Sequence, residues 1–290
     1  MKRIAVTGAT GKQGRAVVEL LTNEGYEVFG LDVTPPPVKS DSFIKVDFTD
    51  YGQTVDALLG VDSRHDGFDA LVHLAAIPGA GHLSDAATFH NNMSATFNVF
   101  QAARRAGIKN IVYASSETLL GLPFAIDPPY LPVDEEYPSR PESVYSLVKH
   151  LEETMAIELT RWDPSLKIVG LRLSNVMDER DYDRFPSFEA DIKLRDWNLW
   201  AYIDHRDGAQ AVLQALRWDS TGFDTFNIAA DDSVMGRPSA ELAAERFPDV
   251  PLKHAIDGHT SLMSSDKAKR VLGFNPQHSW RDVFVGTPQD

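Results

Sequence analysis

Two side chains four residues apart are of the types that remove a proton from a hydroxyl group while hydride leaves its carbon. Tyr145 and Lys149 lie in the predicted helix 143–162, and their spacing puts both side chains on one face. A phenol with an ordinary pKa of about 10 is a poor base at neutral pH, and a neighbouring ammonium group lowers that pKa. We therefore expect Tyr145 to be the general base and Lys149 to stabilise its phenolate.

A pair of serines follows the predicted strand 110–114, at the sheet edge where ligands bind in parallel α/β folds. The hydroxyl of Ser116 can hold a substrate oxygen next to Tyr145. A serine hydrolase is the alternative for a serine in this place, but Ser115 and Glu117 flank Ser116 where a hydrolase has G-x-S-x-G. Ser116 therefore joins the tyrosine and the lysine as a predicted catalytic residue.

Residues 7–14 read T-G-A-T-G-K-Q-G and lie between the predicted strand 4–6 and a predicted helix. Glycines in such a turn let backbone amides approach a pyrophosphate at the helix N-terminus. Gly8 would make the tight turn, Gly11 would clear space for phosphates, and Gly14 would let the helix lie close to the strand. A Walker phosphate loop is the alternative, but it needs Ser or Thr directly after the lysine. The turn predicts dinucleotide binding, with further contacts from Thr10, Lys12 and Gln13.

An acidic residue ends the second predicted strand, 18 residues after Gly14. In this place Asp32 would accept hydrogen bonds from the adenosine ribose hydroxyls and would repel a 2′-phosphate, which favours NAD over NADP. Asp47 and Phe48 follow the third predicted strand. We expect them to contact the adenine, through the carboxylate of Asp47 and the backbone of Phe48.

Short apolar runs alternate with amphipathic segments over the first 173 residues, as expected for strands and helices that alternate in a parallel sheet. The predicted strands are 4–6, 26–31, 43–46, 70–74, 110–114 and 167–173, and the long helices are 88–106 and 143–162. This alternation predicts the α/β class, with a Rossmann-type doubly wound parallel sheet.

The alternation of strands and helices stops after Leu173. The segment 175–200 is polar and aromatic, without a clear strand. We expect strands at 199–203 and 223–228, and helices at 206–218, 238–246 and 265–272. The predicted division is an NAD-binding Rossmann domain of residues 1–174, to which 201–228 returns, and a small C-terminal substrate-binding lobe of 175–200 and 229–290.

Composition excludes several other functions. The 290 residues carry 42 acidic and 28 basic side chains, and the net charge of −14 argues against nucleic acid or an anionic membrane as partner. The absence of cysteine excludes disulfides and thiolate chemistry, and nine scattered histidines predict no metal site. The most apolar stretch, 70–77, is too short to span a membrane, and the N-terminus lacks a signal-peptide pattern. We expect a soluble cytoplasmic protein.

The sequence resembles the extended short-chain dehydrogenase/reductase family, the NAD-dependent epimerase/dehydratase group. The matching segments are T-G-A-T-G-K-Q-G (7–14), V-D-F-T-D (46–50), H-L-A-A (73–76), N-M-S-A-T-F-N-V-F-Q-A-A (92–103), V-Y-A-S-S-E-T-L-L-G (112–121), Y-S-L-V-K (145–149), L-R-L-S-N-V (171–176), Y-I-D-H-R-D-G-A (202–209) and S-S-D-K-A-K-R-V-L-G-F-N-P (264–276). They follow the family's order along nearly the whole chain.

The resemblance implies an enzyme with NAD as cofactor and a carbohydrate as substrate. It implies that Asn92 supports the helix carrying Lys149, and that the protein is a homodimer formed through helices 88–106 and 143–162. Further cofactor contacts implied by the family pattern are Leu74, Ala75, Ala76, Ala114, Ser115, Tyr145, Lys149, Ser174, Asn175 and Val176.

Departures from the family pattern bear on the substrate. The segment after Leu173 is short for a nucleotide-sugar epimerase, and Glu117-Thr118 after the serine disfavours dehydration. The chain is similar to uronate dehydrogenases, in which an arginine holds the sugar carboxylate, and Arg184 is either that anchor or part of a solvated charged loop. The predicted substrate contacts are Ile77, Ser116, Glu117, Asn175 and Arg184.

These departures favour NAD-dependent oxidation of a small sugar or sugar acid. Nucleotide-sugar 4-epimerisation with tightly bound NAD is the first alternative, because both reactions begin with the same proton and hydride transfers. A non-catalytic dinucleotide-binding sensor is the second alternative, although such relatives usually lack the tyrosine–lysine pair.

Overall fold

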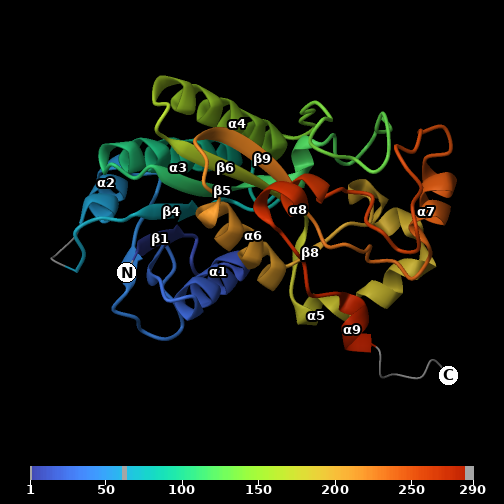
Figure 1. The fold of residues 1–290 in the computed structure, drawn as a ribbon, viewed down its shortest axis with the longest axis horizontal. Helices are drawn as coiled ribbons and strands as arrows, with labels where there is room; N and C mark the ends of the chain where they lie inside the picture. The colour runs from blue at the N-terminus through green and yellow to red at the C-terminus, as the bar shows by residue number, and fades with distance from the viewer. Residues whose placement is uncertain (1, 61–63, 285–290) are drawn as a thin grey trace.

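A seven-stranded parallel sheet forms the centre of the computed structural model, which describes residues 2–60 and 64–284 (Figure 1). Its strand order is β3-β2-β1-β4-β5-β6-β9. The strands are β1 (Arg3–Thr7), β2 (Glu27–Asp32), β3 (Phe43–Lys45), β4 (Ala70–His73), β5 (Asn110–Ser116), β6 (Lys167–Leu173) and β9 (Gly222–Ile228). The order reverses direction between β1 and β4, which confirms the predicted doubly wound sheet and places a ligand crevice at the carboxyl ends of these strands.

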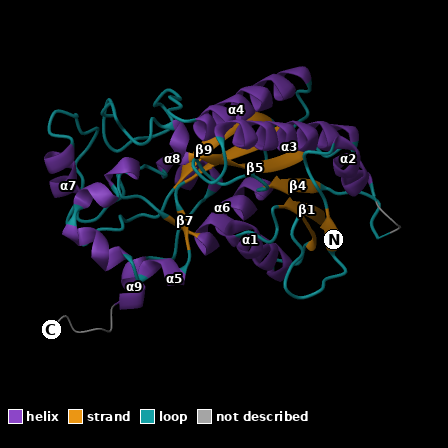
Figure 2. Ribbon diagram, turned by 180° about the vertical axis from the view of Figure 1, so that it is seen from behind, coloured by secondary structure: helices purple, strands orange, loops and turns teal. Residues whose placement is uncertain are grey.

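Helices cover both faces of the sheet (Figures 1 and 2). One face carries α1 (Lys12–Asn23), α6 (His205–Arg217) and α8 (Asp266–Leu272). The other carries α2 (Tyr51–Leu59), α3 (Asp85–Arg105) and α4 (Val144–Trp162). Each layer encloses its own apolar cluster, so the central strands between them are buried on both sides and carry mainly apolar side chains.

A third apolar cluster lies beyond the carboxyl ends of β5, β6 and β9, on the right of Figure 1. It is rich in fully buried aromatic rings, among them Tyr182, Phe185, Trp200 and Tyr202. Its short elements are η1 (Glu117–Leu119), β7 (Val176–Met177), α5 (Glu179–Tyr182), η2 (Phe185–Ala190), η3 (Ile192–Leu194), η4 (Asp196–Asn198), β8 (Ile203–Asp204), α7 (Ser239–Arg246) and α9 (Trp280–Phe284). No helix in the described part of the chain is long and apolar enough to cross a membrane.

Most predicted elements are present with ends shifted by a few residues, but one predicted strand is mostly absent and one helix is missing from the prediction. The strand expected at 199–203 is reduced to β8, because Leu199 and Trp200 adopt left-handed backbone conformations with φ of +59° and +56°. The indole of Trp200 donates to the carbonyl of Ile192 at 2.8 Å and packs into the third cluster, so tertiary contacts override the strand pattern. Helix α2 was not predicted, although Asp50 caps it by accepting from the amide of Gln53.

The glycine turn between β1 and α1 is a backbone-to-backbone contact. Gly8 has a φ of +66°, and a Cβ on it would lie 2.7 Å from the amide nitrogen of Ala75 at the end of β4. A Cβ on Gly14 would lie only 2.0 Å from the carbonyl oxygen of Gly8. Glycine at these two positions therefore allows the first turn of α1 to lie directly against the loop and the neighbouring strand end.

We predict that Gly14→Ala destabilises the protein by about 1–3 kcal/mol, the usual cost of overpacking, because the added methyl meets backbone atoms that cannot rotate away. Urea denaturation of the purified variant measures this free energy. Gly52→Ala in α2 is the matched control, since its nearest atom is a side-chain oxygen of Asp50 at 3.3 Å. Equal stability of Gly14→Ala and the wild type would contradict the close approach.

Candidate active site

A cleft of about 1190 Å³ runs along the carboxyl ends of the strands, from the end of β2 to the start of α4. The predicted cofactor residues all line it: Gly8, Thr10, Gly11, Lys12, Gln13, Gly14, Asp32, Asp47, Phe48, Leu74, Ala75, Ala76, Ala114, Ser115, Tyr145, Lys149, Ser174, Asn175 and Val176. Of the predicted catalytic and substrate residues, Ser116, Glu117 and Ile77 also line the cleft, whereas Asn92 and Arg184 do not. Gly8 and Val176, 168 positions apart in sequence, thus face one cavity.

The N-terminus of α1 opens into this cleft and fits a phosphate. Gly11 is the N-cap and provides no side-chain hydrogen bond to the first turn, and that turn contains no acidic residue. The first amides of α1 therefore remain available to an anion, which the helix dipole favours at this end. These features match the pyrophosphate of a dinucleotide.

Asp32, at the end of β2, is held in a fixed orientation beside the glycine turn. One carboxylate oxygen accepts from the amide and hydroxyl of Thr10 at 3.1 and 2.9 Å, and the other accepts from the amide of Thr34 at 3.1 Å. A carboxylate has about four acceptor sites, so capacity for ribose hydroxyls remains. Nearby, Asp47 accepts from the amide and hydroxyl of Thr49, and Phe48 is buried beside the cleft.

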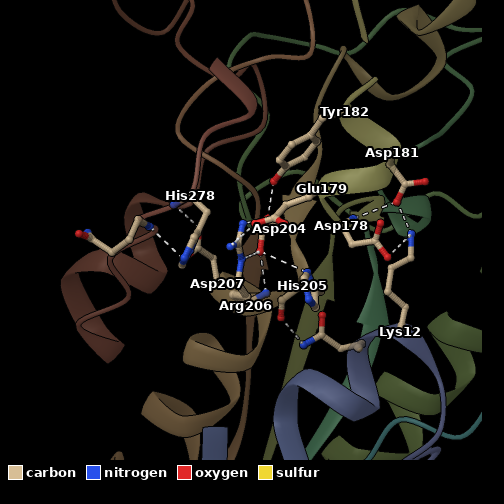
Figure 3. A network of polar contacts seen from close by, with 12 residues as sticks. Lys12, Asp178, Glu179, Asp181, Tyr182, Asp204, His205, Arg206, Asp207 and His278 are labelled. Atoms are coloured by element: carbon tan, nitrogen blue, oxygen red, sulfur yellow. Dashed lines mark hydrogen bonds and ion pairs between the residues drawn. The ribbon is translucent and has the colours of Figure 1, made fainter. Parts of the chain in front are cut away.

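Two further residues of the turn reach across to neighbouring elements, Lys12 to α5 of the third cluster and Gln13 to the start of α6 (Figure 3). The ammonium of Lys12 contacts the carboxylate of Asp181 and lies 3.9 Å from that of Asp178. The amide of Gln13 donates to the carbonyl of His205 at 3.1 Å. The predicted cofactor residues Lys12 and Gln13 thus also join the dinucleotide end of the cleft to the segment after β6.

Asp204, at the end of β8, is the centre of the network in Figure 3. Its buried carboxylate accepts from the guanidinium of Arg206 and from the hydroxyl of Tyr182. Burial opposes ionisation, but these donors and His205 outweigh it and lower the pKa of Asp204 well below its usual range. The ionised carboxylate holds α5 and α6 together beside the glycine turn.

Tyr145 and Lys149 stand side by side at the opposite end of the cleft. Ser143 and Ser146 form a capping box that starts α4 at Val144, so Tyr145 lies in the first turn of the helix. The ammonium of Lys149 lies 5.9 Å from the centroid of the Tyr145 ring and donates to the carbonyl of Ala114 at 2.8 Å. This arrangement is the same-face pair that the spacing predicts.

Burial raises the pKa of Tyr145, and the charge of Lys149 and the hydroxyl of Ser116 offset only part of this effect. Burial lowers the pKa of Lys149, but its ion pair with Glu152 reverses the direction and raises the pKa. Lys149 is therefore charged in the folded protein, and Tyr145 is protonated.

The structure separates the roles of the two serines, which sequence alone could not. Ser115 donates to the carboxylate of Glu153 at 2.7 Å, and Glu153 is also paired with Arg172. Ser116 accepts from the amide and hydroxyl of Thr118 at 3.2 and 2.9 Å. The proton of Ser116 is thus left for a group in the cleft.

Glu117 lines the substrate end of the cleft and is nevertheless buried. Burial raises its pKa to about 7, although Ser174 donates to it at 2.6 Å and Asn198 donates at 3.2 Å. Arg195, also buried, donates to the side chain of Asn175 at 3.0 Å. Glu117 is therefore hydrogen-bonded to Asn198 of η4, and Asn175 is hydrogen-bonded to Arg195, the N-cap residue of η4.

Two predicted residues have contacts away from the reacting groups. The amide of Asn92 bonds the backbone of Ile77 at 2.8 and 3.0 Å and accepts from Asn91, so it holds the loop after β4. Arg184 is exposed and pairs with Asp181 at 3.0 Å. Its role as a substrate anchor stays a prediction that these contacts do not support.

Several residues around the site were missed from the sequence. Glu152 and Glu153 follow Lys149 by three and four positions, a spacing that places them on the same helix face and could have indicated them. Arg195, Trp197 and Asn198 come from a segment without periodicity, which gave no such signal. The described residues, 2–60 and 64–284, contain no group of three His, Asp or Glu side chains arranged to hold a metal ion.

Two proteins with similar sequences are named as enzymes of a nucleotide sugar and of a free sugar. A UDP-glucose 4-epimerase of Bacillus subtilis (strain 168) is 27% identical over 335 aligned positions, which cover 97% of this chain and 94% of the relative. An L-arabinose 1-dehydrogenase (NAD(P)(+)) of Haloferax volcanii is 34% identical over 167 positions, covering 53% of this chain and 60% of the relative.

A solved structure supports the cofactor. A short-chain dehydrogenase/reductase superfamily protein from Agrobacterium tumefaciens, crystallised with bound NAD, superposes with a TM-score of 0.71 at 25% identity. The superposition covers 98% of this chain and 95% of that protein. Together with the cleft and a family match over residues 4–229, this similarity makes NAD the cofactor of this chain.

The family model described as "NAD dependent epimerase/dehydratase family" matches residues 4–229. The match covers every strand of the sheet, from β1 to β9, as well as the glycine turn and the Tyr145–Lys149 pair. The chain therefore belongs to the NAD-dependent epimerase/dehydratase family of the extended short-chain dehydrogenases/reductases.

Proposed function

We propose that this enzyme oxidises a hydroxyl group of a small sugar or sugar acid. The observation that carries the proposal is the meeting of Ser116, Tyr145 and Lys149 at the end of the cleft opposite Asp32. A dinucleotide that binds Asp32 through its ribose and α1 through its phosphates would extend toward these three side chains. NAD supplies the hydride acceptor when bound.

The chain's own residues then handle the proton and the substrate oxygen. Ser116 donates a hydrogen bond to the substrate oxygen and positions it, and Tyr145, in its deprotonated form, removes the hydroxyl proton. Before this transfer, the charge of Lys149 and the helix dipole at the N-terminus of α4 stabilise the phenolate form of Tyr145. The ketone or lactone product leaves through the cleft.

The length of the chain favours a small substrate. Pockets for drug-sized ligands measure about 300–1,000 Å³, so the cleft of about 1190 Å³ has room for a dinucleotide and a second ligand and does not itself fix the substrate size. The Bacillus subtilis epimerase aligns over 335 positions with a chain of 290 residues, so it carries at least 45 residues that this chain lacks. The name of the Haloferax volcanii relative, an arabinose dehydrogenase, fits an unactivated sugar.

Nucleotide-sugar 4-epimerisation is the second candidate, because the Bacillus subtilis relative covering 97% of this chain is named a UDP-glucose 4-epimerase. An epimerase must hold the nucleotide while the ketone turns over. We propose that residues 175–200 and 229–290 form the lobe that holds the substrate. In this lobe the guanidinium of Arg195 lies over the rings of Phe188 and Trp197, 5.5 and 5.1 Å from their centroids.

The two candidate reactions differ in whether NADH accumulates. With NAD and a panel of free aldoses and uronates, we expect one of these sugars to be oxidised with stoichiometric formation of NADH, followed by its absorbance. The same preparation is then given UDP-glucose and UDP-galactose, and the products are separated by chromatography. Interconversion of a UDP-sugar without NADH build-up, and no turnover of any free sugar, would overturn the proposal.

Tyr145→Phe removes the general base and keeps the ring, so we predict a loss of turnover of about 10²–10⁴-fold. Calorimetric titration should give nearly unchanged affinity for NAD, which separates a lost proton acceptor from a damaged cleft. Tyr51→Phe in α2 is the matched control, away from the cleft lining. Turnover retained in Tyr145→Phe would show that another group removes the proton.

We also propose a homodimer formed through α3 and α4. Four large apolar side chains are exposed on these adjacent helices: Phe97, Leu147, Ile157 and Trp162, at 39–58% of their full accessibility. Sedimentation equilibrium should give twice the chain mass of 32.1 kDa, and Ile157→Glu should shift it to the single-chain value. A single-chain mass for the wild type at micromolar concentration would exclude this interface.

A further inference from the structure

Behind Lys149 lies a buried carboxylate that proton removal by Tyr145 does not require. Glu152 is one turn further along α4 and is fully buried, with its carboxylate 2.9 Å from the ammonium of Lys149. A buried charge is costly unless it is paired and hydrogen-bonded. The presence of Glu152 in this place therefore has consequences for the two reacting side chains in front of it.

A chain of hydrogen bonds continues from Glu152 to the glycine turn. Thr96 of α3 donates to Glu152 at 2.8 Å and lies 3.1 Å from Nε2 of His73. Nδ1 of His73 lies 2.7 Å from the hydroxyl of Thr7, which accepts from the amides of Leu74 and Ala75. Thr7, His73, Thr96, Glu152 and Lys149 are all at most 3% exposed.

The hydrogen-bond partners and the lowered pKa of His73 together assign the protons in this row of hydrogen bonds. Thr96 uses its single proton on Glu152, so Nε2 of His73 must donate to Thr96. Nδ1 of His73 then accepts from Thr7, and the imidazole is neutral, in agreement with burial lowering its pKa to about 3. Glu152 accepts hydrogen bonds from both Thr96 and Lys149, as an ionised carboxylate does.

The charges around Tyr145 come from four elements. On α4 itself these are Lys149, Glu152 and Glu153, and η1 contributes Glu117. From β4, His73 faces Lys149 and is neutral. From β6, Arg172 is paired with Glu153 through two hydrogen bonds of 2.9 and 2.8 Å, so these two charges cancel. Glu152 is thus the carboxylate paired directly with the ammonium that serves Tyr145.

We propose that Glu152 is a positioning residue that holds Lys149 against Ala114 and, by its negative charge, sets the pH at which Tyr145 loses its proton. The inference rests on the proposed role of Tyr145 as general base. With Glu152 ionised, Tyr145, Lys149 and Glu152 together carry no net charge, and loss of the first proton creates a buried net negative charge. With a neutral residue in place of Glu152, loss of that proton would instead remove a buried net positive charge.

Because the tyrosine and the lysine interact closely, they titrate together, and the sign holds for whichever of them releases the proton first. A neutral residue at position 152 makes the first deprotonation easier. The pair in the wild type therefore begins to lose protons at higher pH than it would without Glu152. This difference is the quantity to measure.

Glu152→Gln keeps the shape and removes the charge. We expect the acid limb of the kcat/KM profile for the oxidised sugar to move to lower pH by about 1 unit or more, since an opposite charge as close as Glu152 is to Lys149, 2.9 Å, shifts a pKa by about 1–3 units. Glu152→Asp restores the charge and should bring the limb back toward the wild-type position. An unmoved limb in Glu152→Gln would overturn the proposal.

Thr96→Val separates charge from structure. It removes one hydrogen bond to Glu152 and keeps the carboxylate, so we expect the limb to stay near the wild-type position. Glu158→Gln, a charge change of the same kind on the exposed side of α4, should leave both the limb and the turnover unchanged. A shift in Thr96→Val as large as that in Glu152→Gln would assign the effect to packing and contradict the proposal.

A measurement without substrate distinguishes failure of this inference from failure of the proposed function. Near-ultraviolet titration of the apoprotein, with Tyr145→Phe subtracted, follows the phenolate of Tyr145 directly. We expect the wild-type residue to titrate above free tyrosine and Glu152→Gln to titrate lower. Should Glu152→Gln fail to fold, the wild-type titration still decides: a Tyr145 that titrates well below free tyrosine overturns the proposal.

Discussion

The burial of ionised groups on one face of α4 is the constraint on which the arrangement of the site depends. Lys149, Glu152 and Glu153 are removed from water, and each is costly there unless it is paired. Their partners are on β5, α3 and β6: the carbonyl of Ala114, the hydroxyl of Thr96 and the guanidinium of Arg172. Satisfying these groups fixes the helix against three neighbours, and the position of Tyr145 follows from it.

The two ends of the cleft are held by different means. At the dinucleotide end the glycine turn lies backbone on backbone, which is why glycine is needed there, and Lys12 and Gln13 add side-chain contacts to α5 and α6. At the substrate end, buried polar side chains of Glu117, Asn198 and Arg195 hold one another. Backbone contacts suit a ligand that a whole family shares. Side-chain contacts can be changed by substitution, as substrate specificity requires.

Sequence patterns sufficed for the sheet, the glycine turn and the tyrosine–lysine pair, because each depends on local periodicity or spacing. They failed where the outcome depends on tertiary contacts: the left-handed Trp200 cannot be inferred from an apolar run, and the hydrogen bond that gives Ser115 a different partner from Ser116 depends on Glu153. Arg184 was chosen for its distance along the chain, and its pairing with Asp181 shows how little that distance determines in an irregular segment.

The hydrogen-bonded chain from Lys149 to Thr7 is closed at its far end. Thr7 receives two backbone amides, and an amide proton of this kind is not passed on, so the chain cannot relay a proton toward the far side of the sheet. Reversing its direction would require Thr7, His73 and Thr96 to turn together inside a packed interior. A proton taken from the substrate therefore does not leave along this chain, and Tyr145, which lines the cleft, releases it on the cleft side.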